Sequence, residues 1–131
     1  MTATLTIRDE STAGKVEGEW TLDFLTEHIT VRELIRSRVY QEVQDHNLKQ
    51  PARFRGLVQP TDAERTLNGE KQRTPRQIDW KKQFETACEA FDAGRVLILV
   101  GQHQCETLEE PIEIRHDTVV SFLRLTPLVG G

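Results

Sequence analysis

Residues 29–43 have the sequence ITVRELIRSRVYQEV, which predicts a capped amphipathic helix. Thr30 and Glu33 form a capping box, in which the hydroxyl accepts from the backbone three residues ahead and the carboxylate reaches back. Apolar residues then recur at helical spacing: Val31, Leu34, Ile35, Val39 and Val43. The pattern ends near residues 46–47, and Pro51 disfavours its continuation. We therefore expect one helix of about four turns.

The chain before this helix alternates between apolar and polar residues in two runs. Leu5 and Ile7 alternate with polar neighbours over residues 3–9, and residues 20–24 repeat the pattern. A period of two is typical of a strand with one buried face. A glycine-containing turn at residues 11–14 joins the runs, so a β-hairpin is predicted.

Residues 49–93 separate the helix from the next strand, and we interpret them as an insertion. Their first part, residues 49–78, holds three of the five prolines and few apolar residues, which favours a long loop. Its apolar residues are expected to pack back on the sheet rather than to recruit a partner; they are Phe54, Leu57 and Val58. A second amphipathic helix is predicted at about residues 79–93, with Gly94 as its C-terminal cap.

The C-terminal part of the chain contains three predicted strands and a tail. Val96–Val100 is a continuous apolar run, typical of a central strand buried on both faces. Ile112 and Ile114 indicate a short strand, and residues 119–125 a longer one. Residues 126–131 are expected to be a flexible tail. The whole chain, residues 1–131, is thus predicted to be a single α+β domain with a mixed sheet packed on one long helix.

Composition restricts the class of protein. The 131 residues include 17 Lys and Arg against 21 Asp and Glu, a net charge of −4. This balance argues against general binding to nucleic acid or to an anionic membrane, neither of which we expect as a partner. The sequence shows no apolar run of ~20 residues and no secretion signal. Two cysteines without CxxC spacing favour a reducing compartment, so a cytoplasmic protein is expected.

The feature with chemical meaning is the glycine pair at 130 and 131, directly after the last predicted strand and its short tail. Because glycine has no side chain, such a tail fits a narrow channel in which a partner enzyme reaches the terminal carboxylate. Adenylation makes that carboxylate reactive, and a thiolate, hydroxyl or amine then takes the acyl group. A chain used in this way needs no catalytic residues, and we expect it not to be an enzyme.

The order of elements and the segment Leu123-Arg124-Leu125 before Gly130-Gly131 resemble ubiquitin and the ubiquitin-like β-grasp proteins. Residues 29–34 are similar to the opening of the single long helix of that family. Residues 122–131 resemble more closely the bacterial ubiquitin-like proteins that are encoded beside activating-enzyme, conjugating-enzyme and JAB-type peptidase homologues. The resemblance covers roughly residues 3–48 and 95–131, and the insertion at 49–93 departs from it.

The resemblance implies a protein modifier. Gly131 would be the residue that is activated and conjugated, and Gly130 would permit its approach. The partners implied are an activating enzyme, which uses ATP, a conjugating enzyme, a JAB-type deconjugating peptidase and target proteins; no cofactor is bound by the chain itself. Docking to the activating enzyme is expected at Leu123, Arg124, Leu125, Leu128 and Val129. Lysines that would accept a further copy are Lys15, Lys49, Lys71, Lys81 and Lys82.

Two other functions share these features. Small β-grasp sulfur carriers also end in two glycines and are adenylated, but they carry sulfur as a C-terminal thiocarboxylate. A non-covalent β-grasp interaction module would contain the terminal glycines incidentally. The chain length and the Leu123-Arg124-Leu125 segment favour the modifier over the sulfur carrier.

Other candidate residues have simpler interpretations. His103 and Cys105 are only half of a zinc ligand set, so we expect no metal and an exposed loop there, with Cys105 exposed. Cys88 lies on the apolar face of the second predicted helix and is expected in the core. A cluster of arginines is expected to form a solvated face, with docking of an acidic partner as the alternative; its members are Arg32, Arg36, Arg38, Arg53 and Arg55.

Overall fold

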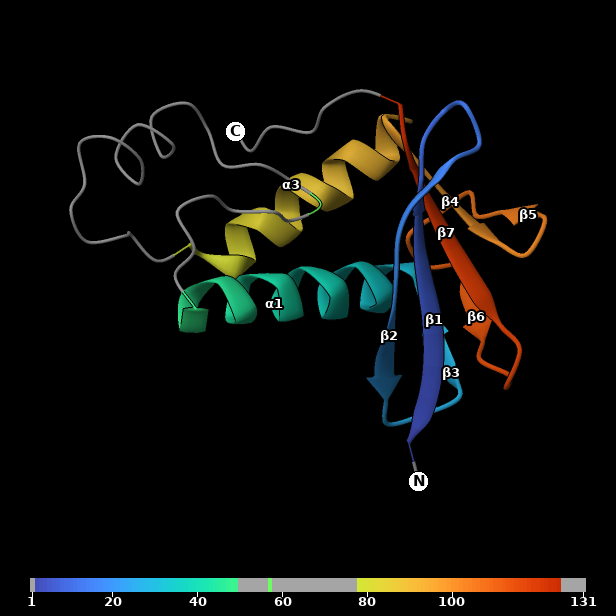
Figure 1. Cartoon of the computed structure of the whole chain (residues 1–131), viewed down its shortest axis with the longest axis horizontal. Coiled ribbons are helices and arrows are strands. Elements are labelled where there is room, and N and C mark those ends of the chain that lie inside the picture. Colours follow the sequence, from blue (N-terminus) through green and yellow to red (C-terminus); the bar gives the residue numbers. More distant parts are fainter. Residues whose placement is uncertain (1, 50–56, 58–77, 126–131) are drawn as a thin grey trace.

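Five strands form one mixed sheet in the part of the chain that this computed structural model describes, residues 2–49, 57 and 78–125 (Figure 1). The strands, in spatial order, are β2 (Val16–Phe24), β1 (Ala3–Glu10), β7 (Val119–Arg124), β4 (Val96–Val100) and β5 (His103–Gln104). β1 and β7 are parallel, and the other neighbours are antiparallel. The predicted α+β class with a mixed sheet is confirmed, as is the N-terminal hairpin.

A second, two-stranded sheet holds the start of the first helix. It pairs β3 (His28–Thr30) with β6 (Pro111–Glu113), so the short strand predicted at Ile112 has a partner that the sequence did not indicate. The amide of Val31 donates to the carbonyl of Glu110, and the amide of Arg32 donates to that of Leu108. These bonds satisfy helical N–H groups that have no partner within a helix.

Helix α1 (Val31–Lys49) begins at the predicted capping box. The Glu33 amide donates to Thr30 Oγ1 at 3.2 Å, and the Thr30 amide donates to Glu33 Oε2 at 3.3 Å. The helix is longer than predicted, because polar residues near its end find partners. The Asn47 side chain accepts from the Ile78 amide at 3.0 Å and donates to the Ile78 carbonyl at 3.2 Å, so the apolar pattern ends before the helix does.

Replacing Thr30 with alanine is expected to lower the free energy of unfolding by about 1 kcal/mol, because the Glu33 amide loses its acceptor. Urea unfolding followed by circular dichroism measures this loss. Thr30→Ser keeps the hydroxyl and should retain most of the stability. If both variants lost the same amount, the methyl group rather than the cap would be responsible.

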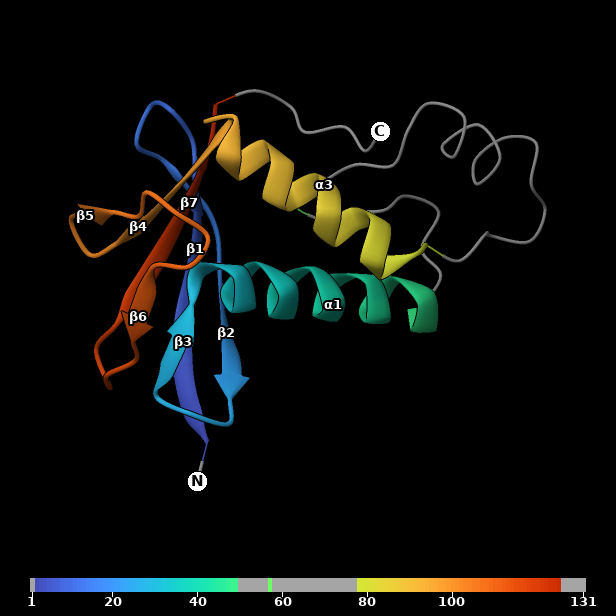
Figure 2. The ribbon, with the colours of Figure 1, turned by 180° about the vertical axis from the view of Figure 1, so that it is seen from behind.

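Helix α3 (Trp80–Asp92) confirms the second predicted helix. The Asp79 side chain caps its first turn by accepting from the Lys81 amide at 3.0 Å. Gly94 follows the last helical turn with a φ of +75°, a conformation that favours glycine. Figure 2 shows α3 lying alongside α1, with both helices on the same side of the sheet.

The core lies between this side of the sheet and the helices. Along β4 only Val96 and Ile98 are buried, because the helices cover one face of the strand and leave the other partly exposed. The expectation that β4 is buried on both faces is therefore wrong, although β4 is an interior strand between β7 and β5; β7 holds the middle position. Leu57 is 1% exposed and belongs to the core, as predicted, whereas Phe54 and Val58 lie outside the described residues.

Candidate functional site

The C-terminal end of β7 carries the first three predicted docking residues. Leu123 pairs with Leu97 of β4, and Arg124 pairs with Val96. The Leu125 amide donates to the Arg95 carbonyl at 2.9 Å, so the backbone is bonded to its neighbour up to the last described residue. The other predicted site residues of the tail lie outside the described residues: Leu128, Val129, Gly130 and Gly131.

The strand alternation places these side chains on opposite faces of the sheet. Val120 and Phe122 are fully buried, so Arg124 continues the face that is turned toward the helices. Leu123 lies on the other face, and Leu125 is 43% exposed. The predicted docking segment therefore presents no single surface, and its arginine belongs to the helix-facing side.

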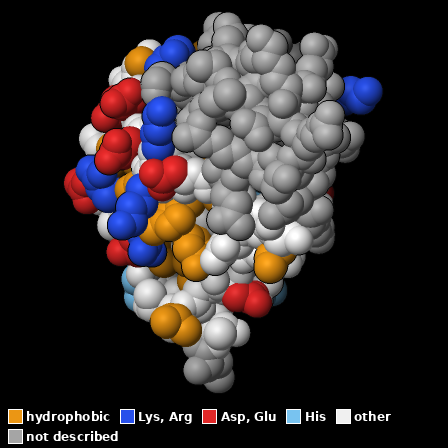
Figure 3. All heavy atoms as spheres, turned by 90° about the vertical axis from the view of Figure 1, so that its left-hand side faces the viewer, with side chains coloured by type: hydrophobic (Ala, Val, Ile, Leu, Met, Phe, Trp, Pro, Cys, Tyr) orange, Lys and Arg blue, Asp and Glu red, His pale blue; other side chains and the backbone are white. Residues whose placement is uncertain are grey.

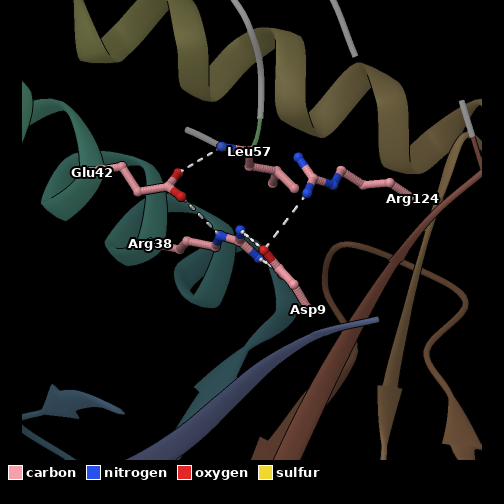
Figure 4. Close-up of polar contacts among 5 residues, drawn as sticks. All are labelled: Asp9, Arg38, Glu42, Leu57 and Arg124. Carbon is pink, nitrogen blue, oxygen red and sulfur yellow. Dashed lines mark hydrogen bonds and ion pairs between the residues drawn. The ribbon is translucent and has the colours of Figure 1, made fainter. Parts of the chain in front are cut away.

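A buried arginine lies beside this strand end (Figure 4). Arg38 of α1 is 2% exposed, and its guanidinium donates to both oxygens of Asp9 on β1, at 2.7 and 2.8 Å. It also stacks on the ring of Phe122, with 4.4 Å between its central carbon and the ring centroid. The expectation that Arg38 belongs to a solvated basic face is therefore wrong, because a carboxylate of β1 and aromatic rings pair with it inside the core.

Glu42 extends this cluster by one helical turn. Its Oε2 accepts from Arg38 Nε at 3.3 Å, and its Oε1 accepts from the Leu57 amide at 3.0 Å. Burial raises the pKa of Glu42, although Arg38 and the Leu57 amide oppose this by favouring the carboxylate. Burial alone would lower the pKa of Arg38, but the charge of Glu42 and the bonds to Asp9 outweigh it and raise that pKa.

Arg124 completes the cluster from β7. Its Nη2 lies 3.9 Å from Asp9 Oδ2, an ion pair that is too long for a hydrogen bond. Its side chain is 33% exposed, against 12% for that of Asp9. Strand β1, helix α1, strand β7 and the insertion at Leu57 thus meet at one group of charges, which we call the buried charge cluster: Asp9, Arg38, Glu42 and Arg124.

The sequence predictions missed Asp9 and Glu42 and assigned Arg38 to a solvated face, but the positions of all three carried a signal. Asp9 follows Leu5 and Ile7 at the strand period of two. Arg38 and Glu42 continue the apolar face of α1 at intervals of four residues. Opposite charges at inward positions of two packed elements predict a buried ion pair.

The predicted acceptor lysines that the structure describes lie in three places. Lys15 is exposed in the turn between β1 and β2, at the same end of the sheet as the end of β7, because Glu10 pairs with Leu123. Lys81 and Lys82 are exposed on α3, and Lys49 ends α1. Lys71 lies outside the described residues.

Both cysteines are buried, which confirms the expectation for Cys88 and shows that the one for Cys105 is wrong. Cys105 is 3% exposed because its amide donates to the Ile98 carbonyl at 2.8 Å and holds it against the core. Burial raises the pKa of the Cys88 thiol to about 11 and that of the Cys105 thiol to about 12.

We expect neither thiol to react with a small thiol reagent at pH 8 in the folded protein, because almost none of either is ionised at that pH. Mass spectrometry before and after unfolding in urea measures the labelling. A variant with the exposed Ala13 replaced by cysteine provides a reactive thiol in the same fold. Rapid labelling of Cys105 in the folded protein would contradict its burial.

The remaining charged candidates do not converge on a site. His103 is exposed and its Nε2 lies 2.5 Å from Glu110 Oε2, and among the described residues no group of three or more His, Cys, Asp or Glu is placed to hold a metal ion. Arg32 pairs with Glu109 at 2.7 Å, and Arg36 lies over the ring of Trp80; Arg53 and Arg55 lie outside the described residues. On the face drawn in Figure 3, basic and acidic side chains are intermixed.

No known protein family, curated protein or solved structure matches this chain. None of the helices that the structure describes has the length and apolar character needed to cross a bilayer. The candidate site consists of a strand end that is hydrogen-bonded on both sides and whose arginine belongs to the buried charge cluster.

Proposed function

We propose that this chain is a ubiquitin-like protein modifier with a β-grasp fold, in which the carboxyl group of Gly131 is the reacting group. The observation that supports this most is the place of β7. It lies between β1 and β4 in the middle of the mixed sheet, and one residue, Leu125, separates its end from the predicted tail. A tail attached to the middle strand of a sheet starts from a fixed point, which favours the precise delivery of its end to a partner enzyme.

The proposed reaction uses the chemistry of the partners. An activating enzyme joins the Gly131 carboxylate to AMP from ATP and releases pyrophosphate, and a thiolate or hydroxyl then displaces AMP to give a thioester or oxyester. A conjugating enzyme passes the acyl group to a target amine, which forms an amide bond. A JAB-type peptidase hydrolyses that bond. In this scheme the chain acts in the cytoplasm as substrate and docking surface, and it supplies no catalytic group.

The sulfur carrier remains the second candidate, since it shares the adenylation step. The chain length and the Leu123-Arg124-Leu125 segment favour the modifier, because small β-grasp sulfur carriers tend to be shorter and to lack a long insertion before the third strand. A non-covalent module is the third candidate, and it would make no use of the terminal carboxylate.

The deciding experiment starts from the intact mass of the purified mature chain, since the proposal requires that it end at Gly131. The chain is then incubated with ATP, Mg²⁺ and an activating-enzyme homologue of the kind that the resemblance implies. Pyrophosphate release and an adduct sensitive to thiol or base support the modifier. A mass gain equal to the exchange of one oxygen for sulfur identifies the sulfur carrier. If no ATP-dependent product forms with any such homologue, the non-covalent module is the function that remains.

A further inference from the structure

At the centre of the buried charge cluster, two carboxylates share one guanidinium. Asp9 and Glu42 are both carboxylates, and Arg38 is the cation between them, so these three groups together carry one excess negative charge when Glu42 is ionised. An uncompensated charge in the protein interior is costly. The fourth member, Arg124, supplies the charge that makes the whole cluster neutral.

The contact of Arg124 with Asp9 is long for a reason that the geometry shows. Both oxygens of Asp9 already accept hydrogen bonds from Arg38, which lies closer by more than an ångström. Arg124 is therefore attracted by the net charge of the cluster more than by a hydrogen bond to Asp9. Its one-third exposed side chain has access to solvent, so this attraction competes with water and with any outside anion.

We propose that the excess negative charge of Asp9, Arg38 and Glu42 holds the guanidinium of Arg124 against the buried charge cluster, and that neutralising Glu42 releases it. Glu42 thus controls the accessibility of Arg124 without touching it. The consequence for docking of a partner at the base of the tail rests on the proposed function. The release itself is a property of the isolated chain.

Leu57, a residue of the insertion, also affects the charge of Glu42. Its amide donates to Glu42 Oε1, a bond that favours the charged carboxylate. Burial acts in the opposite direction and raises the pKa of Glu42, so protonation of this side chain occurs at a higher pH than for an exposed glutamate. Loss of the Leu57 contact would favour protonation further. The position of Leu57 and the freedom of Arg124 are therefore coupled through one carboxyl group.

The groups around Glu42 come from each element packed against it. Arg38 precedes it by one turn on α1, and His46, whose pKa is lowered by burial, follows it by one turn. Asp9 faces the cluster from β1 and Arg124 from β7. The buried residues of α3 carry no charged side chain; they are Gln83, Ala87, Cys88, Ala90 and Phe91.

The test measures hydrogen exchange at the Nε–H of Arg124 by NMR, with the exposed Arg115 as reference in the same sample. Glu42→Gln keeps the shape and an acceptor for the Leu57 amide but removes the charge. We expect the exchange rate of Arg124 relative to Arg115 to rise about two- to fivefold, the range for loss of an ion pair with an exposed partner. Asp45→Asn, an exposed carboxylate on the same helix, should leave the ratio unchanged.

A pH titration of the unmodified chain provides the second measurement. As the pH falls through the raised pKa of Glu42, the carboxylate becomes neutral, and the ratio should rise to the value of Glu42→Gln. That variant should lack this step. The proposal is overturned if Glu42→Gln folds and leaves the ratio unchanged, or if only Asp9→Asn raises it. Because no enzyme is present, either failure leaves the proposed function untouched.

Discussion

Replacing Arg38 with methionine is expected to lower the free energy of unfolding by about 3–5 kcal/mol at neutral pH. The side chain is 2% exposed, so methionine fills much of its volume but removes the cation to which Asp9 and Glu42 are both hydrogen-bonded. Arg124 then remains as the one cation for two carboxylates. Urea unfolding at pH 7 measures the loss. This loss in the free energy of unfolding should exceed the loss caused by replacing any single exposed charged residue.

The pH dependence of this loss identifies its cause. Burial raises the pKa of Glu42 and Arg38 opposes this, so loss of Arg38 should raise the folded-state pKa of Glu42 further above its unfolded value. The folded variant then gains protons as the pH falls, and its deficit relative to the unmodified chain should shrink on acidification. A deficit that stays constant down to acidic pH would indicate lost packing on Phe122 instead of lost charge pairing.

Arg36→Met is the matched control on the same helix. Arg36 is exposed and lies over the ring of Trp80, a contact worth under about 1 kcal/mol at such a site. A triple variant that also replaces Asp9 with asparagine and Glu42 with glutamine removes the uncompensated charges. It should recover part of the stability that Arg38→Met loses.

Deleting Gly131 is expected to lower the rate of ATP-dependent activation by at least about 100-fold, if the chain is the proposed modifier. The new terminal carboxylate belongs to Gly130 and falls short of the reacting position by one residue, roughly 3.5 Å of extended chain. Pyrophosphate release with the activating-enzyme homologue measures the rate. Thermal unfolding should be unchanged, because chain ends contribute little to stability.

Leu25→Ala is the control for this experiment. Leu25 is 90% exposed in the segment between β2 and β3, so its removal changes the surface without changing the predicted reacting group. Activation should proceed at the unmodified rate. Equal rates for the deletion variant and the full chain would show that the terminal carboxylate does not react, and would favour the non-covalent module.

The elements that follow from local sequence were predictable. The capping box at Thr30 fixes the start of α1, because both of its hydrogen bonds lie within four residues. The two hairpin strands and α3 follow from their hydrophobic periods. Partners distant in sequence were not predictable in the same way: nothing near Ile112 indicates that it pairs with Ile29, and the run Val96–Val100 does not say which of its faces a helix covers.

The buried charge cluster was the main omission at the candidate site. A charged residue on a helix is usually solvated, and a single sequence gives no direct sign that Arg38 meets Asp9 across 29 positions. The burial of Cys105 was missed for the same reason: it depends on a contact outside the local pattern, the hydrogen bond from its amide to the Ile98 carbonyl. The apolar run at residues 119–125 predicted the end of β7 correctly. The face of the sheet on which Arg124 lies was known only from the structure.

The parallel pairing of β1 with β7 has a consequence for biosynthesis. Residues 6–10 find their partners at residues 119–123, so the middle of the sheet closes only between nearly opposite ends of the chain. Such long-range closure slows folding, and it cannot take place until the ribosome has released the last strand. A truncated product that lacks β7 would leave one side of β1 unpaired and the core without Val120 and Phe122, and an unpaired strand edge is prone to aggregation. A chain that stops before β7 therefore cannot close the sheet to which the tail is attached.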